Sequence, residues 1–139
     1  MNPPSHQRPK DFPVGRRLFA RLPVLLALLA GAAFAQTPPE GRWRCYQPPA
    51  YTVLAWFDLG GGQIAVDRNP PLRVTADAAT GRVALPAGAL APHREALYLP
   101  PGHAQGDAER HTLVLLRSPG QKPGGRGWER LPRCYMTTH

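Results

Sequence analysis

The sequence predicts an all-β fold, a small antiparallel barrel of about seven to eight short strands, with a β-sandwich as the alternative. After residue 35, no stretch of ten residues has the 3.6-residue apolar period of an amphipathic helix, and proline interrupts nearly every candidate window. Short alternating apolar runs recur instead between Gly, Pro and Asn turn signals, about 8–12 residues apart. The length of 139 residues leaves room for one compact domain.

The first 35 residues are predicted to be an export signal, a signal peptide, and not part of the fold. A stretch with five Lys and Arg precedes fourteen uncharged residues, 22–35, too few for the roughly 20 apolar residues of a membrane-spanning helix. Ala33 and Ala35 stand where a signal peptidase reads, so we expect cleavage before Gln36. The mature protein is then secreted or extracytoplasmic, in a periplasm or cell envelope. An uncleaved membrane anchor is one alternative, and a translation start at Val14 is another.

Cleavage at this point changes the charge balance. The whole chain has 17 Lys+Arg against 9 Asp+Glu, a formal net charge of +8. Residues 36–139, which form the single predicted β domain, keep 12 of the cationic and 8 of the acidic residues, a net charge of +4. A modest basic excess of this kind favours an anionic partner without specifying it.

Three strands are predicted in the first part of this domain. Gly41–Tyr46 alternates Trp43 and Cys45 with polar or amphipathic residues, as a half-buried strand does. Tyr51–Leu59 is dense in aromatic and β-branched residues, which predicts a central strand. Three consecutive glycines then form a turn into Gln63–Asp67, which alternates again.

Four further short runs and an interrupted last strand complete the predicted barrel. Turn residues and a Pro/Gly-rich bend separate them. We expect strands at Leu72–Thr75, Arg82–Leu85, Arg94–Leu99 and His111–Arg117, and a last strand made of Trp128–Leu131 and Cys134–Thr137. The two longest connections, residues 100–110 and 118–127, are polar and rich in Gly and Pro, so we expect them to be flexible.

The two cysteines, Cys45 and Cys134, lie near the two ends of the mature domain. In an exported chain, two thiols with one pairing predict a disulfide, here between the first and last strands. Such a link is worth about 4 kcal/mol in the chain-entropy model. Joining these strands also removes both sheet edges, which favours a barrel over a sandwich. Two buried free thiols are the alternative.

Three short motifs occur in order along the domain. Gly41–Cys45 has the form Gly-x-Trp/Tyr-x-Cys, Gly81–Leu90 has the form Gly-x-Val-x-Leu followed by Gly-x-Leu, and Cys134 closes the chain. This arrangement resembles a loose group of small exported bacterial β-barrel proteins of unassigned function. The resemblance implies the fold and the location, and it brings no catalytic residues. The two Pro-rich loops depart from the pattern.

Residues suited to catalysis are few. The only serine after residue 35, Ser118, lies in a Ser-Pro-Gly turn, and no Gly-x-Ser-x-Gly elbow occurs. His103, Asp107, Glu109 and His111 are weak candidates for a divalent metal or a general base. Most of them lie in a polar loop, where we expect solvated side chains. We therefore predict no cofactor and a non-enzymatic protein, and we rank a metal-dependent hydrolase third.

An outward face of arginine and tyrosine is the predicted binding site. Along the first strand Arg42, Arg44 and Tyr46 alternate with the core residues. They come close to Arg133 and Tyr135 if the first and last strands pair. Such a face suits an anionic polymer, a lipid head group or a small ligand. One Gly-Gly-Arg-Gly run does not support specific nucleic-acid recognition.

The leading hypothesis from the sequence is an exported, monomeric barrel that binds a ligand or an anionic envelope component on this face. The second hypothesis is a structural or protein-interaction module, for example an inhibitor that presents residues 100–110. After signal cleavage, no transmembrane span is expected in residues 36–139.

Overall fold

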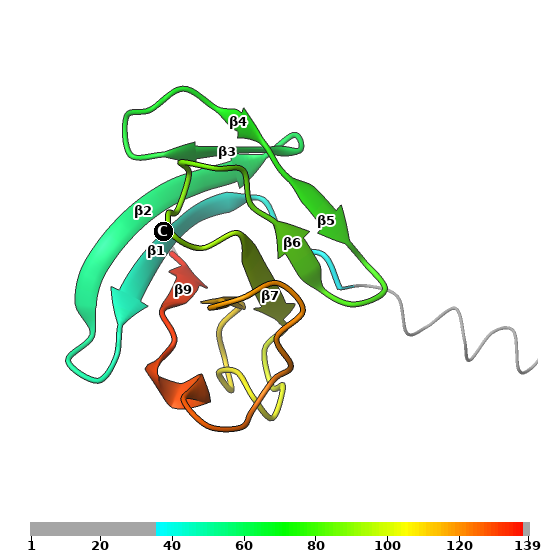
Figure 1. The fold of residues 1–139 in the computed structure, drawn as a ribbon. Coiled ribbons are helices and arrows are strands. Elements are labelled where there is room, and N and C mark those ends of the chain that lie inside the picture. Colours follow the sequence, from blue (N-terminus) through cyan, green and yellow to red (C-terminus); the bar gives the residue numbers. More distant parts are fainter. Residues whose placement is uncertain (1–35, 138–139) are drawn as a thin grey trace, which may run out of the picture. The chain divides into compact units, whose positions relative to one another are not determined.

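The computed structural model describes residues 36–137, and the predicted export signal lies outside them. These residues form an antiparallel, nearly closed barrel (Figure 1), which confirms the predicted fold class. The described part of the chain contains nine strands, slightly more than predicted, and one short 3₁₀ helix. They are β1 (Gly41–Gln47), β2 (Thr52–Gly60), β3 (Gln63–Val66), β4 (Leu72–Arg73), β5 (Thr75–Asp77), β6 (Arg82–Ala84), β7 (Glu95–Leu99), β8 (Thr112–Leu115), η3 (Trp128–Arg130) and β9 (Arg133–Met136).

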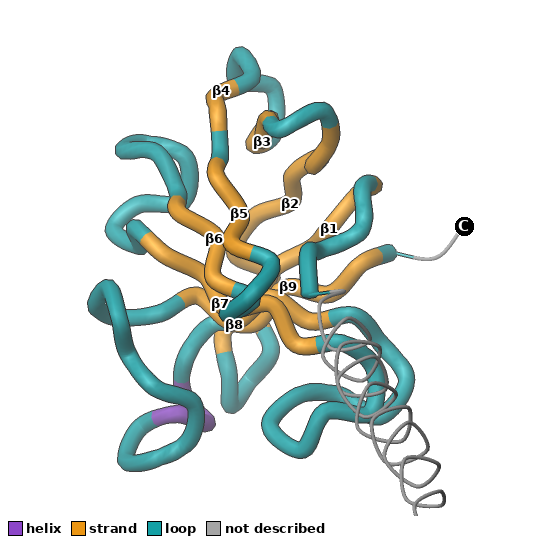
Figure 2. The backbone as a smooth tube through the Cα atoms, turned by 90° about the vertical axis from the view of Figure 1, so that its right-hand side faces the viewer, coloured by secondary structure: helices purple, strands orange, loops and turns teal. Residues whose placement is uncertain are grey.

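The strands follow one another as a continuous meander in the order β4-β3-β2-β1-β9-β8-β7-β6-β5. The two strands at the ends of this order, β4 and β5, are consecutive in the chain and are separated only by Val74 (Figure 2). The N–H of Val74 donates to the carbonyl of Gly62 at 2.9 Å. One bent segment therefore pairs with β3 through β4 and with β6 through β5. This bend divides the predicted strand Leu72–Thr75 in two and nearly closes the barrel.

A disulfide between Cys45 and Cys134 joins β1 to β9. The two residues lie directly opposite each other in the antiparallel ladder between these strands. The predicted covalent link between the first and last strands is confirmed. It connects positions 89 residues apart, so it closes a loop that contains most of the domain.

Large apolar side chains fill the interior of the barrel. Trp43, Phe57 and Ile64 are at most 1% exposed, and the rings of Trp43 and Phe57 stack with their centroids 6.2 Å apart. Along β1, Trp43 and Cys45 are buried, while Arg42 and Arg44, which alternate with them, are exposed. This is the period of two that a strand with one buried face requires. The inward face is thus a packed core, and the outward face carries the residues that can meet a partner.

A second apolar core lies on the outer side of β7 and β8. The four residues of β8 are all buried, so this strand buries both of its faces. The segment after β8 folds back over the outer face, and Trp128 and Leu131 complete a cluster with Leu97, Leu99, Val114 and Leu116. The predicted strand at Trp128–Leu131 is wrong. Gly127, at φ 82°, turns the chain into η3, which lets Trp128 cover β8.

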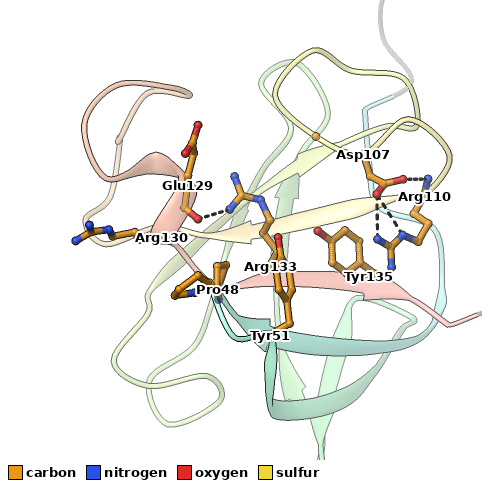
Figure 3. A pocket seen from close by; sticks show the side chains of 10 residues that line it. Pro48, Tyr51, Asp107, Arg110, Glu129, Arg130, Arg133 and Tyr135 are labelled. Atoms are coloured by element: carbon orange, nitrogen blue, oxygen red, sulfur yellow. Dashed lines mark hydrogen bonds and ion pairs between the residues drawn. The ribbon is translucent and has the colours of Figure 1, made fainter.

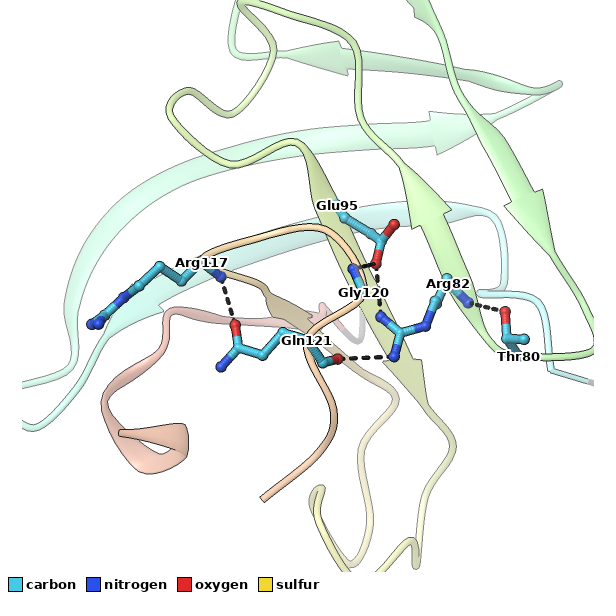
Figure 4. Close-up of polar contacts among 6 residues, drawn as sticks. All are labelled: Thr80, Arg82, Glu95, Arg117, Gly120 and Gln121. Carbon is cyan, nitrogen blue, oxygen red and sulfur yellow. Dashed lines mark hydrogen bonds and ion pairs between the residues drawn. The ribbon is translucent and has the colours of Figure 1, made fainter. Parts of the chain in front are cut away.

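Polar contacts hold the loop at residues 118–127 to the barrel (Figure 4). Arg82 donates from Nη1 to Glu95 Oε1 at 2.7 Å and from Nη2 to the carbonyl of Gln121 at 2.8 Å. The same Glu95 oxygen accepts the N–H of Gly120 at 3.0 Å. The side chains of this Arg–Glu pair are only 24% and 18% exposed. The start of the loop is thereby attached to β6 and β7.

Candidate functional site

The outward residues of β1 and β9 come together as the sequence predicts. The two strands pair in an antiparallel ladder that places Arg44 opposite Tyr135 and Tyr46 opposite Arg133. The rings of Tyr46 and Tyr135 are 6.1 Å apart between centroids, inclined at 45°. These four predicted residues therefore lie together on the outer side of the two strands, where Tyr135 is only 9% exposed. Whether they bind a ligand stays a prediction.

A surface pocket of about 680 Å³ opens at one end of this patch (Figure 3). Three arginines from different parts of the C-terminal segment line it, together with two tyrosines and two acidic side chains. The pocket includes two residues of the predicted site, Arg133 and Tyr135. The complete lining is Pro48, Pro49, Tyr51, Gly106, Asp107, Arg110, Glu129, Arg130, Arg133 and Tyr135.

Arg110 is held over the ring of Tyr135 by Asp107. Its Cζ lies 3.8 Å from the Tyr135 ring centroid, and its Nη2 donates to Asp107 Oδ2 at 3.0 Å. Asp107 Oδ1 accepts the backbone N–H groups of Glu109 at 2.8 Å and Arg110 at 2.9 Å. The Glu109 N–H, followed by the Arg110 side chain, lowers the pKa of Asp107. Burial raises the pKa of Tyr135, so this phenol stays protonated and neutral.

Neither Arg133 nor Arg130 forms an ion pair with a carboxylate of the described residues, so both keep their positive charge. Arg133 Nη1 donates to two backbone carbonyls, those of Glu129 at 3.3 Å and Leu131 at 3.2 Å. The side chain of Arg130 is exposed and makes no hydrogen bond to any described residue. A smaller pocket of about 280 Å³ shares Arg130 and adds Arg117. Two neighbouring hollows thus have a common arginine.

The turn between β1 and β2 supplies the remaining wall of the pocket. Tyr51 is 54% exposed and has a positive φ of 56°, which is unusual for a residue with a side chain of this size. Its N–H donates to the carbonyl of Gln47 at 2.8 Å. Gln47 in turn donates from Nε2 to the carbonyl of Arg130 at 2.8 Å, which ties η3 to the end of β1. The contributions of Tyr51, Arg110 and Arg130 were not predicted from the sequence.

Arg42, a predicted site residue, lies outside the pocket at the other end of β1. Its guanidinium contacts both carboxylate oxygens of Asp58, at 3.0 and 3.2 Å, and lies 4.7 Å from the centroid of Trp56. These hydrogen bonds lower the pKa of Asp58. Arg44 is exposed beside Tyr135 but does not line the pocket. The candidate site is therefore displaced toward β9 from its predicted centre.

The four titratable residues suggested for metal or acid–base chemistry have separate contacts. His103 Nδ1 accepts the N–H of Gln105 at 3.1 Å, and His111 Nδ1 is hydrogen-bonded to the hydroxyl of Tyr98 at 2.7 Å. Asp107 is engaged with Arg110 and two backbone N–H groups, and Glu109 is exposed. Within residues 36–137, no three His, Cys, Asp or Glu side chains lie close enough together to hold a metal ion.

The positive charge of the domain is concentrated in its last segment. Residues 110–137 carry six Lys and Arg and a single acidic residue, a net charge of +5. Residues 36–109 carry six Lys and Arg and seven acidic residues, a net charge of −1. The segment that carries the excess is also the one that covers β8 and lines both hollows.

Comparison of the chain with protein-family models, curated proteins and solved structures finds no match. In the part of the chain that the structure describes, no helix has the length and apolar character needed to cross a membrane. The pocket and the charge distribution are therefore the features of the molecule that bear on its function.

Proposed function

We propose that this protein is an exported, non-enzymatic, monomeric β-barrel that binds an anionic polymer of the cell envelope through Arg130 and Arg133, the two arginines of the pocket that are not paired with a described carboxylate. The observation that carries the proposal is the concentration of basic charge in residues 110–137, the segment that supplies both arginines. Guanidinium groups recognise carboxylate, sulfate and phosphate oxygens by charge-assisted hydrogen bonds.

The geometry supports an extended polymer over a single small anion. The two hollows share Arg130, so arginines continue from Arg133 through Arg130 to Arg117. The exposed ring of Tyr51 offers a flat surface on which a sugar ring can pack. Arg130 and Arg133 retain donors that no described carboxylate occupies, and these donors can bind successive anionic groups.

The proposed location rests on the sequence and on the disulfide. Residues 1–35 have the pattern of an export signal, and the Cys45–Cys134 bond is compatible with an oxidising, extracytoplasmic compartment.

Retention on immobilised dextran sulfate tests the proposal. We expect the mature protein to be retained at low salt and released by about 0.5 M NaCl, where the Debye length falls to a few ångströms. Arg117→Ala/Arg130→Ala should weaken binding at least tenfold, since a hydrogen bond to a charged group contributes about 1.5 kcal/mol or more. Neither side chain has a hydrogen-bond partner among the described residues, so the fold should be preserved.

The matched control removes two exposed arginines elsewhere. Arg68→Ala/Arg73→Ala lowers the net charge by the same amount, and both residues lie far along the chain from the basic segment. We expect this variant to keep nearly all of the retention. Equal loss in both variants would reduce the effect to net charge and would contradict the proposed site.

A further inference from the structure

The edge of β2 that faces away from β1 is only partly paired. Strand β3 pairs with β2 from Phe57 to Gly60, and one further hydrogen bond joins the N–H of Asp67 to the carbonyl of Trp56 at 2.9 Å. Asp67 has a positive φ of 53°, and there the chain turns away from β2. Residues 52–55 consequently have no ladder partner on this side among residues 36–137. Figure 1 shows β3 running beside only one part of the long, curved β2.

Apolar side chains accompany this unpaired edge. Val53 is 57% exposed and Leu54 is 50% exposed. The register of β1 and β2 shifts here, because Cys45 pairs with Ala55 while the next residue of β1 pairs with Val53. Leu54 is thus the extra residue of a β-bulge, which explains why two consecutive apolar side chains are both exposed.

A pocket of about 410 Å³ adjoins the same edge. Leu54 and Ala55 form one wall, and the bend after β6 forms another with Leu90 and Pro92. Val66 and Leu115, both members of the buried interior, also reach its lining. The lining also includes the carboxylate of Asp67 and the imidazole of His93. Most of the lining side chains are apolar, and the pocket has room for one large apolar side chain.

The surroundings of this edge carry few of the charges that usually protect an exposed strand, and Asp67 is the one charged residue in the lining of the pocket. Neither residues 47–57 nor residues 83–93, the two segments that line most of the pocket, contain an Asp, Glu, Lys or Arg. Native edge strands are commonly guarded by a lysine, a proline, an inward-pointing charge or a β-bulge, and of these residues 52–55 have only the bulge at Leu54. The basic segment at residues 110–137 contributes only Leu115 to the lining. This surface is therefore chemically different from the proposed anion site.

We propose that the edge at residues 52–55 binds an extended, uncharged polypeptide segment of a partner protein by strand addition, with one large apolar side chain in the adjoining pocket. Unpaired backbone N–H and C=O groups are complemented by another extended backbone, and a neighbouring pocket selects a side chain. A second copy of this chain fits less well. A ladder of four residues per copy would bury less surface than the roughly 1,000 Å² that a stable dimer interface buries. The proposal is independent of anion binding.

Selection from a display library of random octapeptides tests the proposal on the mature, disulfide-bonded protein. We expect selected peptides to carry large apolar residues at alternate positions and few charges. Their binding should protect the backbone amides of residues 52–55 from hydrogen exchange. N-methylation of the peptide residues whose N–H groups face β2 should weaken binding at least tenfold. N-methylation of the residues between them, whose N–H groups face away from β2, should not. Equal tolerance of N-methylation on both edges would contradict strand addition.

Two substitutions at exposed positions provide the variant and its control. Leu54→Lys places a guarding charge on the edge, and we expect it to weaken the selected peptides at least about tenfold. Leu72→Lys, at another exposed apolar residue on β4, should leave binding unchanged. Failure of the wild-type protein to enrich any peptide over Leu54→Lys would overturn the proposal. So would concentration-dependent dimerisation that Leu54→Lys abolishes, since the occupant would then be a second copy.

Discussion

The outer face of β1 and β9 carries arginine at both ends, but in two different electrostatic situations. At one end Arg42 is paired with Asp58 through two hydrogen bonds, so its charge is largely cancelled locally. At the other end, Arg133 donates to backbone carbonyls, and Arg130 has no hydrogen-bond partner among the described residues. The same residue type is thus a cross-strand contact at one end and an available anion ligand at the other. The hydrogen-bond partners of each arginine distinguish these two roles, and the number of arginines does not.

The largest effect is expected from breaking the covalent link between the two strands of this face. Cys45→Ser/Cys134→Ser should lower the free energy of unfolding by about 4 kcal/mol, because the disulfide restricts most of the unfolded chain. Urea denaturation followed by tryptophan fluorescence measures this. A loss below about 1 kcal/mol would show that the packed core alone fixes the pairing of β1 with β9.

The next effect concerns the residue that positions the basic segment. Trp128→Ala should cost about 3 kcal/mol or more, because it empties the outer core beneath η3. Trp128→Phe should cost far less, since the buried Nε1 of Trp128 has no hydrogen-bond partner among the described residues. Urea denaturation compares the two variants. Equal destabilisation by Trp128→Ala and Trp128→Phe would contradict the role of Trp128 as an apolar cover that needs no hydrogen bond.

A direct comparison of the two ends uses single substitutions. Arg130→Ala should weaken binding to dextran sulfate by about tenfold, the equivalent of one charge-assisted hydrogen bond. Arg42→Ala should change it less than twofold, because Asp58 already occupies that guanidinium. Isothermal titration calorimetry in low salt provides both affinities. A larger loss from Arg42→Ala would reverse the assignment of the two ends.

The smallest effect is expected from pH. The pKa of Asp107 is lower in the folded protein than its ordinary value, so the carboxylate stabilises the fold fully above the unfolded-state pKa of about 3.9. That contribution is lost as pH falls through the lower folded-state pKa. The stability difference between the wild type and Asp107→Asn should therefore be constant from about pH 5 to 8 and should shrink below about pH 4. Urea denaturation across this pH range measures the stability difference. A difference that grows on acidification would contradict the lowered pKa of Asp107.

The sequence predicted the barrel well where alternation is strong and covalent chemistry is simple. Gly41–Tyr46 and Tyr51–Leu59 lie within one residue of β1 and β2, and the two cysteines are bridged. The bend at Val74 could not be predicted, because it depends on which neighbour each half of the segment pairs with. Local alternation contains no information on that choice.

The site was predicted only in part, because its walls come from segments that tertiary packing brings together. Arg133 and Tyr135 follow from strand alternation once β9 pairs with β1. Arg130 reaches the pocket only because Trp128 covers the outer face of β8. One signal in the sequence pointed there: the continuous run Thr112–Leu116 buries both faces and needs an apolar cover. Trp128 and Leu131 are the nearest large apolar residues that follow it in the chain.

A chemical-shift map tests most directly whether the β9 end of this face binds anions. The ¹⁵N-labelled, disulfide-bonded mature protein is titrated with a short sulfated dextran oligosaccharide. We expect the largest shifts at residues 130–133 and at Tyr135, with little change at Arg42 and Asp58. Shifts centred on Arg42 and Asp58, or spread evenly over the basic residues, would contradict the claim that the β9 end of this face is an anion-binding site.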